Sequence, residues 1–236
     1  MKQLIVDRRI SDKCEYSLLK EGFSLIKLPP DPSLPSPIAS HPDTVMFFCD
    51  GEIITTADYC DAAAYVFSDV REYSPEIRIT FTADRRTDKY PMDCIMNALK
   101  IGNKLFCKSD SLSEGILSFA KQRGYEIIHT NQGYPACATL SFGNSAVTSD
   151  RGLASLLEKN GVRVTLIGTG GISLPPYEYG FIGGACGVVD KRVYFFGDIN
   201  SHPDSKIILD AINNEGFKAI SLSDEPLTDL GGIIAL

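Results

Sequence analysis

Four short stretches of the sequence share one pattern, a glycine followed by a run of β-branched, aromatic and other apolar residues. They are KEGFSLIKL, QRGYEIIHT, KNGVRVTLI and NEGFKAISL, at residues 20–28, 122–130, 159–167 and 214–222. Each follows a segment with apolar residues at helical spacing, so the glycine stands where the end of a helix favours a left-handed residue. A helix, a glycine and a strand therefore recur along the chain, and this periodicity restricts the fold more than any single motif.

A second element recurs upstream of the helices, consisting of an apolar run, a short turn and another apolar run. The four copies are DTVMFFCDGEIITT, DCIMNALKIGNKLFCK, ACATLSFGNSAVTSD and GACGVVDKRVYFFGD. Glycine, asparagine or aspartate at each turn is typical of β-hairpins. The unit is thus strand, strand, helix, strand, repeated roughly every 45 to 50 residues. In the second copy, whose helix is expected near residues 58–71, the glycine is missing.

The first helix and strand, at residues 11–28, have no hairpin before them. KQLIV at residues 2–6 offers one strand, and GGIIAL at residues 231–236 offers another. Pairing of the two would complete a fifth unit and leave neither as a lone edge strand. We therefore expect a single α/β domain over residues 1–236, a ring of five ββαβ units whose fifth unit is closed by both ends of the chain.

Two helix starts carry recognisable signals. Ser111 and Glu114 have the spacing of a capping box. Pro203 suits the first turn of a helix, with Ser201 or Asp204 as the capping residue.

The composition is that of an ordinary globular protein, with 44% hydrophobic and 22% charged residues. No apolar run reaches the ~20 residues that span a bilayer, and no apolar signal region is found, so we expect a cytoplasmic protein without membrane contact.

Seven singly scattered cysteines fit a reducing compartment and offer no metal-ligand spacing. The net charge of −7 argues against a nucleic-acid partner. Two prolines soon after LIGTGG prevent the helix that a nucleotide site needs, and no cofactor is expected.

Five ββαβ units with both chain ends in one unit resemble the pentein superfamily, the fold of the guanidino-modifying enzymes. NQGYPAC, SFGNSAVTSDRG, PPYEYGFIGGACG and GDINSHPD are similar to an uncharacterised bacterial branch of that fold. For the enzymes, the resemblance implies a cysteine thiolate that attacks the guanidinium carbon, a histidine that moves protons, and carboxylates that bind the guanidinium nitrogens.

In these enzymes the nucleophile follows a late pair of glycines, in a pattern like Gly-Gly-x-x-Cys. Gly231 and Gly232 match the pair, and two isoleucines follow them. Ala235 stands where the cysteine is expected, and a methyl group cannot act as a nucleophile. The resemblance therefore implies that the covalent mechanism is absent from this chain.

Residues that precede the inner strands of such a ring are expected to meet at one central mouth. His41, Asp43, Asp93 and Asp229 hold such positions. Three carboxylates and a histidine around one opening would suit a guanidinium or an amine, with His41 as a proton shuttle. An alternative stays open, in which the aspartates cap loops before strands and the histidine bonds only to Asp43.

Further candidates precede two other inner strands. Cys137 and Cys186 are candidates for a displaced nucleophile, although a free cysteine more often packs as a small apolar side chain. Gln132 and Tyr134, in the loop NQGYP, have amide and phenol groups that suit a ligand or an ordinary turn. The long loop ISLPPYEYGFIGG is expected to cover the mouth, with its tyrosines as aromatic contacts.

The sequence supports two candidate functions, one as a binding protein and one as an enzyme. The first is a binding protein that lacks the family's nucleophile and takes a small polar or cationic ligand at the mouth. The alternative is a diverged guanidino or amidino hydrolase or deiminase that uses Cys137 or Cys186 with His41. A lowered thiol pKa and fast alkylation would favour the second function. The sequence does not indicate an oligomeric state.

Overall fold

The computed structural model describes residues 2–236 and is built from three-stranded sheets. Four sheets follow the predicted order of a hairpin, a helix and a returning strand. They are β3 (Met46–Cys49), β4 (Glu52–Thr56), α3 (Ala64–Tyr73) and β5 (Arg78–Thr82); β6 (Ala98–Ile101), β7 (Lys104–Cys107), α4 (Glu114–Arg123) and β8 (Glu126–His129); β9 (Thr139–Phe142), β10 (Ser145–Thr148), α5 (Arg151–Lys159) and β11 (Arg163–Leu166); and β12 (Cys186–Val189), β13 (Arg192–Phe195), α6 (Ser205–Asn214) and β14 (Lys218–Ser221). Short helical turns add α2 (Pro42–Val45), η1 (Ala57–Tyr59) and η2 (Ile199–Ser201).

The fifth sheet joins the two ends of the chain. In it β1 (Gln3–Asp7) lies between β15 (Ile234–Ala235) and β2 (Ser24–Leu28), which follows α1 (Asp12–Lys20). Leu4 pairs with Ala235 and Ile5 with Ile234 in antiparallel register, as predicted. The partner of GGIIAL is therefore KQLIV.

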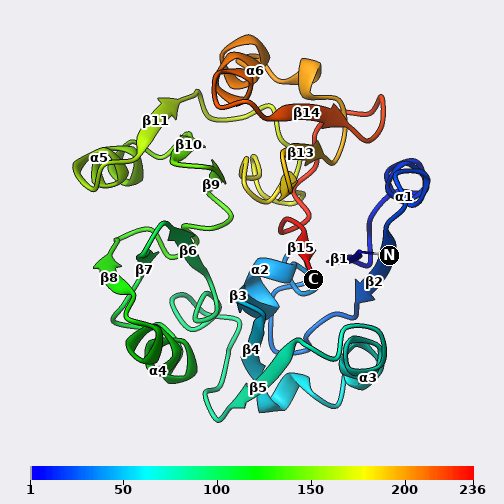
Figure 1. Cartoon of the computed structure of the whole chain (residues 1–236), viewed down its shortest axis with the longest axis vertical. Helices are drawn as coiled ribbons and strands as arrows, with labels where there is room; N and C mark the ends of the chain where they lie inside the picture. The colour runs from blue at the N-terminus through cyan, green and yellow to red at the C-terminus, as the bar shows by residue number, and fades with distance from the viewer. Residues whose placement is uncertain (1) are drawn as a thin grey trace.

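All five sheets have the same pattern of strand pairing. The inner strand (β3, β6, β9, β12 or β15) is antiparallel to the middle strand, and the middle strand is parallel to the outer strand that follows the helix. Figure 1 shows the inner strands toward the centre of the molecule and the five longer helices at its periphery. Such a parallel pair needs a crossover connection, which the helix supplies.

The hydrophobic core is divided into five clusters, and each combines side chains of two neighbouring sheets. This division follows from strand geometry, because successive side chains of a middle strand point to opposite faces. The middle-strand residues that share a cluster are Ile5 and Ile53, Ile54 and Leu105, Phe106 and Ala146, Val147 and Val193, and Tyr194 and Leu4. The last pair joins the sheet of β13 to the sheet of β1.

Glycines end or follow the helices as predicted, while one helix start differs from its prediction. Gly22, Gly124, Gly161 and Gly216 all have positive φ. The predicted capping box is wrong, since Ser113 rather than Ser111 caps α4, and its Oγ accepts the N–H of Gly115 at 3.1 Å. The same Ser113 hydroxyl donates to Asp84 at 2.6 Å, so a tertiary contact determines where this helix begins.

The predicted caps of α6 also differ from the structure. Asp204 occupies the N-cap position of α6, but its carboxylate accepts the N–H of Gly168 at 2.6 Å and makes no cap bond. Ser201 instead donates to the carbonyl oxygen of Asp198. The second helix is shorter than the predicted 58–71, because η1 and a turn occupy its first part.

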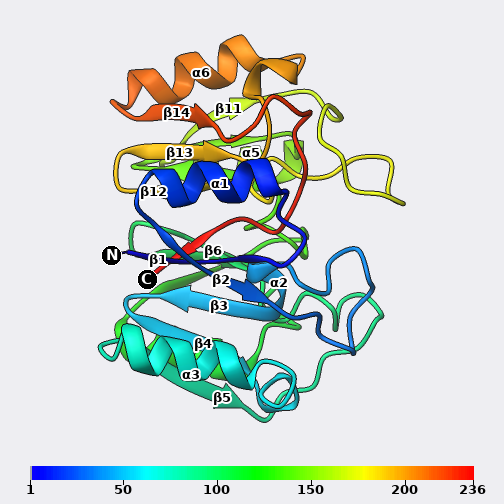
Figure 2. The same cartoon turned by 90° about the vertical axis from the view of Figure 1, so that its right-hand side faces the viewer.

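Long connectors precede several inner strands on one side of the molecule. Figure 2 shows the connectors that lead to β3, β6 and β12 on the side away from the labelled chain ends. No helix within residues 2–236 combines the length and apolar character needed to cross a membrane. The connectors bring together the residues that line the candidate site.

Candidate functional site

A cavity of about 430 Å³ lies among the connectors, and we call it the tyrosine cavity. Its lining residues are Ile38, His41, Tyr90, Asp93, Tyr134, Cys137, Leu174, Tyr177, Glu178, Tyr179, Phe181 and Asp229. Five of the residues predicted from the sequence thus line one cavity: His41, Asp93, Tyr134, Cys137 and Asp229. A cavity of this size is within the range of small-molecule sites.

Every sheet contributes to the tyrosine cavity through the segment before its inner strand. His41 precedes β3, Asp93 precedes β6, and Tyr134 and Cys137 precede β9. Asp229 precedes β15, and the segment before β12 supplies Leu174 to Phe181. The side chains come from distant parts of the sequence and meet because the strand starts converge.

His41 is buried between two carboxylates. Its Nδ1 lies 3.7 Å from Asp229 Oδ1 and its Nε2 lies 3.8 Å from Asp7 Oδ2, both too long for hydrogen bonds. Neither ring nitrogen has a hydrogen-bond partner among the described residues. Burial lowers the pKa of His41, although Asp229 and Asp7 act in the opposite direction. The imidazole is therefore neutral near pH 7 and offers one nitrogen as an acceptor.

Asp229 connects the segment before β12 to the segment before β15. Its Oδ2 accepts the backbone N–H of Phe181 at 2.8 Å, and its Oδ1 accepts that of Gly231 at 3.1 Å. Burial raises the pKa of Asp229, while His41 and the two backbone donors oppose the change. A side chain at Gly231 would place Cβ 2.2 Å from the Cβ of His41, so this approach requires glycine.

Beside the tyrosine cavity, Asn97 joins two of the predicted residues. Its Nδ2 lies 2.9 Å from the carbonyl oxygen of Asp43 and 3.2 Å from Cys137 Sγ. Its Oδ1 accepts the N–H of Ala136 at 2.8 Å. Asn97 was missed from the sequence; the only signal was a polar residue in the apolar run before β6.

Asp43 lines a different cavity of about 320 Å³, which we call the strand cavity because residues of all five inner strands line it. Burial raises the pKa of Asp43 to about 8, with Asp229 adding to the rise and a hydrogen bond to Cys137 opposing it. Burial also raises the pKa of Cys137 well above its ordinary value, and the charges of Asp43 and Asp229 raise it further. Cys137 is thus a protonated thiol near neutral pH.

Asp93 supplies an unsatisfied acceptor to the tyrosine cavity. Its side chain is buried, and its Oδ1 has no hydrogen-bond partner within residues 2–236. Tyr134 is beside it. Burial is the main cause that raises the pKa of the Tyr134 phenol, and the neighbouring Asp93 raises it further. Such a carboxylate oxygen in an aromatic wall is a feature expected of a site for a cation.

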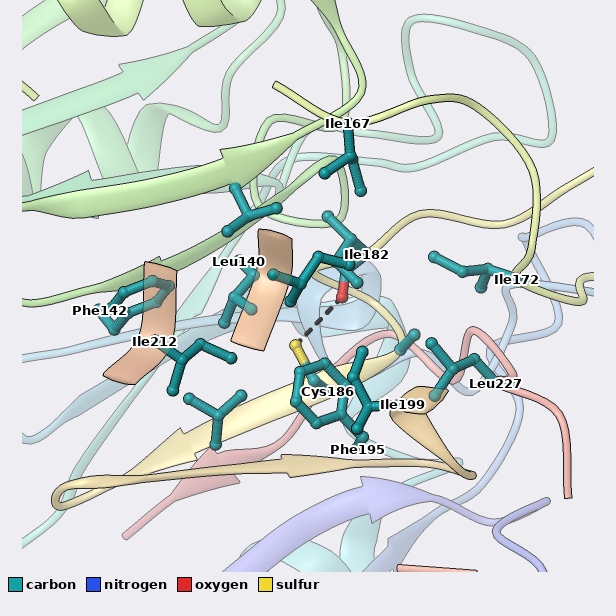
Figure 3. Close-up of a cluster of buried hydrophobic side chains, with 14 of the residues drawn as sticks. Leu140, Phe142, Ile167, Ile172, Ile182, Cys186, Phe195, Ile199, Ile212 and Leu227 are labelled. Carbon is teal, nitrogen blue, oxygen red and sulfur yellow. Dashed lines mark hydrogen bonds between the residues drawn. The ribbon is translucent and has the colours of Figure 1, made fainter. Parts of the chain in front are cut away.

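Three of the predicted residues do not line the tyrosine cavity, which corrects the expected grouping. Asp43 lines the strand cavity instead, and Gln132 and Cys186 also lie outside the tyrosine cavity. Gln132 donates to Asp150 at 2.8 Å and lines a separate groove at the start of α5. Cys186 is packed in a hydrophobic cluster, as Figure 3 shows. Its Sγ lies 3.1 Å from the carbonyl oxygen of Ile182. Burial raises the pKa of Cys186, so this thiol is also protonated.

Ala235 also lies outside the tyrosine cavity. It pairs with Leu4 and lines a cavity of about 300 Å³ together with Asp43 and Met46, among others. The position where the sequence pattern expects a nucleophile is thus in a different cavity from His41. Cys137 is the one thiol among the lining residues of the tyrosine cavity.

Solved structures of similar fold include a dimethylarginine dimethylaminohydrolase and two amidinotransferases. A dimethylarginine dimethylaminohydrolase in an adduct with S-methyl-L-thiocitrulline has a TM-score of 0.60 at 11% identity, covering 94% of this chain and 92% of its own. The inosamine-phosphate amidinotransferase StrB1 of Streptomyces griseus has a TM-score of 0.58 at 16% identity, covering 98% and 91%. SxtG, an amidinotransferase of the saxitoxin pathway from Microseira wollei, has a TM-score of 0.54 at 12% identity, covering 89% and 72%. The resemblance to the pentein superfamily is thereby confirmed at the level of fold.

Sequence comparisons lead to a family without an assigned activity. The model of a family of unknown function, DUF6873, matches residues 5–234. No curated protein sequence matches the chain.

Proposed function

We propose that this chain, which belongs to the family of unknown function DUF6873, binds a small organic cation in the tyrosine cavity. The observation that carries the proposal is the chemistry of the lining, in which three carboxylates (Asp93, Glu178 and Asp229) accompany five aromatic rings. Among the described residues, neither lysine nor arginine lines this cavity. A cation would gain from the carboxylates and from the faces of the rings.

The experiment is a thermal-shift titration of the full chain with agmatine, arginine and simple alkylamines. A ligand at about 100 times its dissociation constant stabilises a protein by ~2.7 kcal/mol, so a cation that binds is expected to raise the melting temperature by several degrees. Alcohols of matched length serve as neutral controls. If no cation raises the melting temperature more than its alcohol does, the proposal is wrong.

The proposed role is binding without covalent catalysis. Support comes from Cys137, whose raised pKa makes it a poor nucleophile, and from Ala235, which provides no nucleophile in its own cavity. The alternative, a diverged hydrolase or deiminase that uses Cys137 with His41, is favoured by one observation, that both residues line the tyrosine cavity.

Alkylation rates distinguish the two functions. In the binding protein, we expect iodoacetamide to modify Cys137 near pH 7.5 more slowly than the half-buried Cys60, because Cys137 is buried and protonated. Peptide mapping by mass spectrometry over time gives both rates in one sample. Faster modification of Cys137 than of every other cysteine would favour the hydrolase.

The proposed architecture is one pseudo-symmetric ring of five ββαβ units in a single domain. Its support is the common strand pairing of the five sheets and the five clusters between neighbouring sheets. The cluster that contains Tyr194 and Leu4 links the last sheet to the first. In such a ring, the mouth at the strand starts is where a ligand would be held.

A further inference from the structure

The acceptors that the tyrosine cavity offers at depth are few. Asp93 Oδ1 is buried and without a hydrogen-bond partner in the part of the chain that the structure describes. Both ring nitrogens of His41 are also unpaired within residues 2–236, but Nδ1 lies 3.7 Å from Asp229 and Nε2 lies 3.8 Å from Asp7. Asp93 Oδ1 is therefore the unsatisfied buried acceptor, among the described residues of the cavity wall, to which a bound ligand is expected to donate.

The other two carboxylates of the lining are less suited to hold a buried head group. Asp229 already accepts the backbone N–H groups of Phe181 and Gly231 and faces His41. It is also enclosed by the chain, since a Cβ at Gly184 would lie 2.0 Å from its Oδ1. Glu178 is exposed at the rim of the cavity. A second free carboxylate at depth, which a bidentate grip on both sides of a guanidinium would need, is therefore lacking among the described residues.

Counting donors separates the two common classes of organic cation. A guanidinium carries up to five N–H donors in a fixed plane, whereas a primary or secondary ammonium carries three or two. Each buried donor that lacks an acceptor costs affinity, so a single free carboxylate matches an ammonium much better than a guanidinium. The remaining wall, which includes Tyr90, Tyr177 and Leu174, suits ring-face contacts with the cation and an apolar body behind it.

We infer that the tyrosine cavity selects a primary or secondary alkylammonium ion with an apolar body over a guanidinium of the same length. The inference rests on the proposed function, because it specifies which cation the same cavity takes. Asp93 is the residue that holds the ammonium head, and the aromatic and aliphatic lining holds the body.

The test is isothermal titration calorimetry of the full chain with n-pentylamine, N-methylpentylamine and n-pentylguanidine, with 1-pentanol as the neutral control. Both amines are expected to bind at least about tenfold more tightly than the guanidine, because each unmatched buried donor weakens binding by roughly that factor. Guanidine binding as tight as or tighter than amine binding would overturn the head-group inference and leave the proposed function standing. Absence of saturable binding by all three cations would instead overturn the proposed function.

A matched pair of variants assigns the head group to its residue. Asp93→Asn retains the shape of the side chain but removes its charge, and it is expected to weaken n-pentylamine binding by at least about tenfold. Asp190→Asn removes an exposed carboxylate that pairs with Lys2 outside the cavity, and it should leave the affinity unchanged. Unchanged affinity in a folded Asp93→Asn variant would show that another group holds the ammonium. Were that variant unfolded, the comparison of amine and guanidine on the unmodified chain would still decide the inference.

Discussion

Buried acidic side chains around His41 and Cys137 are the main feature of this protein at the scale of single residues. Asp7 and Asp229 face His41, and Asp43 adjoins Cys137. Burial disfavours the charged form of an acid and raises the pKa values of Asp43 and Asp229, and the neighbouring Asp229 adds to the rise at Asp43. Arg9 forms an ion pair with Asp7, and its positive charge compensates the negative charge of that carboxylate.

Asp43 makes the stability of the fold depend on pH. Its pKa is about 8 in the folded chain against an ordinary value of 3.8, so between these values the folded state binds more protons than the unfolded state. The free energy of unfolding therefore falls as pH rises through this range. Asp43→Asn, which imitates the neutral acid, is expected to reduce the loss between pH 5 and pH 8 by about 1–3 kcal/mol, allowing for the partial exposure of the side chain.

Urea denaturation of the unmodified chain and of Asp43→Asn at several pH values measures the difference. Asp190→Asn, with a carboxylate that is 76% exposed, is the control and should follow the unmodified chain. Parallel pH profiles for Asp43→Asn and the unmodified chain would contradict the raised pKa.

At the scale of elements, the segment before β12 approaches the start of β9 closely at one glycine. A Cβ at Gly183 would lie 2.2 Å from the carbonyl oxygen of Ala136 and 2.5 Å from that of Thr139. At Gly183 the segment before β12 thus closely approaches the backbone at Ala136 and Thr139. At Gly22, after α1, φ is +90° and nothing lies within 4 Å of the added Cβ. Gly183 is needed because a side chain there would have no space, and Gly22 is needed because its backbone has a positive φ.

Gly183→Ala and Gly22→Ala separate these two requirements. Gly183→Ala is expected to lower the free energy of unfolding by about 3 kcal/mol or more, because backbone atoms must move apart. Gly22→Ala should cost about 1 kcal/mol, the cost of a left-handed backbone with a side chain. Chemical denaturation of the two variants gives the comparison, and equal losses would show that the packing of the strand starts is not tight.

At the scale of the whole molecule, the sheet of β15, β1 and β2 holds the two ends of the chain together. Leu236 donates its N–H to the carbonyl oxygen of Gln3 at 2.9 Å, and Leu4 and Ile5 of β1 are fully buried. Figure 2 shows the labelled ends of the chain close to each other. A covalent link between the ends would thus complete a hairpin like those of the other four sheets.

A circular permutant tests this architecture. Its ends are joined by a short glycine-rich linker, and the chain is opened at the exposed turn between Gly102 and Asn103. Because adjacent ends and an exposed turn leave the core intact, we expect the permutant to fold with a free energy of unfolding within about 1 kcal/mol of the original. Circular dichroism and urea denaturation check this outcome. A permutant that fails to fold cooperatively would contradict the prediction that the unit formed by the two chain ends is equivalent to the other four.

The sequence by itself determined the repeating unit and the pairing of the chain ends. Those features depend on local signals, namely glycines with positive φ after helices, turn residues between apolar runs, and an apolar segment at each end. The same logic located His41, Asp93, Tyr134, Cys137 and Asp229 before inner strands, and these residues line one cavity.

Only the tertiary structure decided which candidates meet and in what charge state. Gln132 and Cys186 also lie close to inner strands, yet one binds Asp150 and the other packs in the core. Asn97 joins Asp43 to Cys137 through contacts that no local pattern encodes, because its partners lie at least 39 residues away. The physical reason is that backbone conformation depends on near neighbours, whereas burial, which sets these pKa values, depends on segments that meet only after the chain has folded.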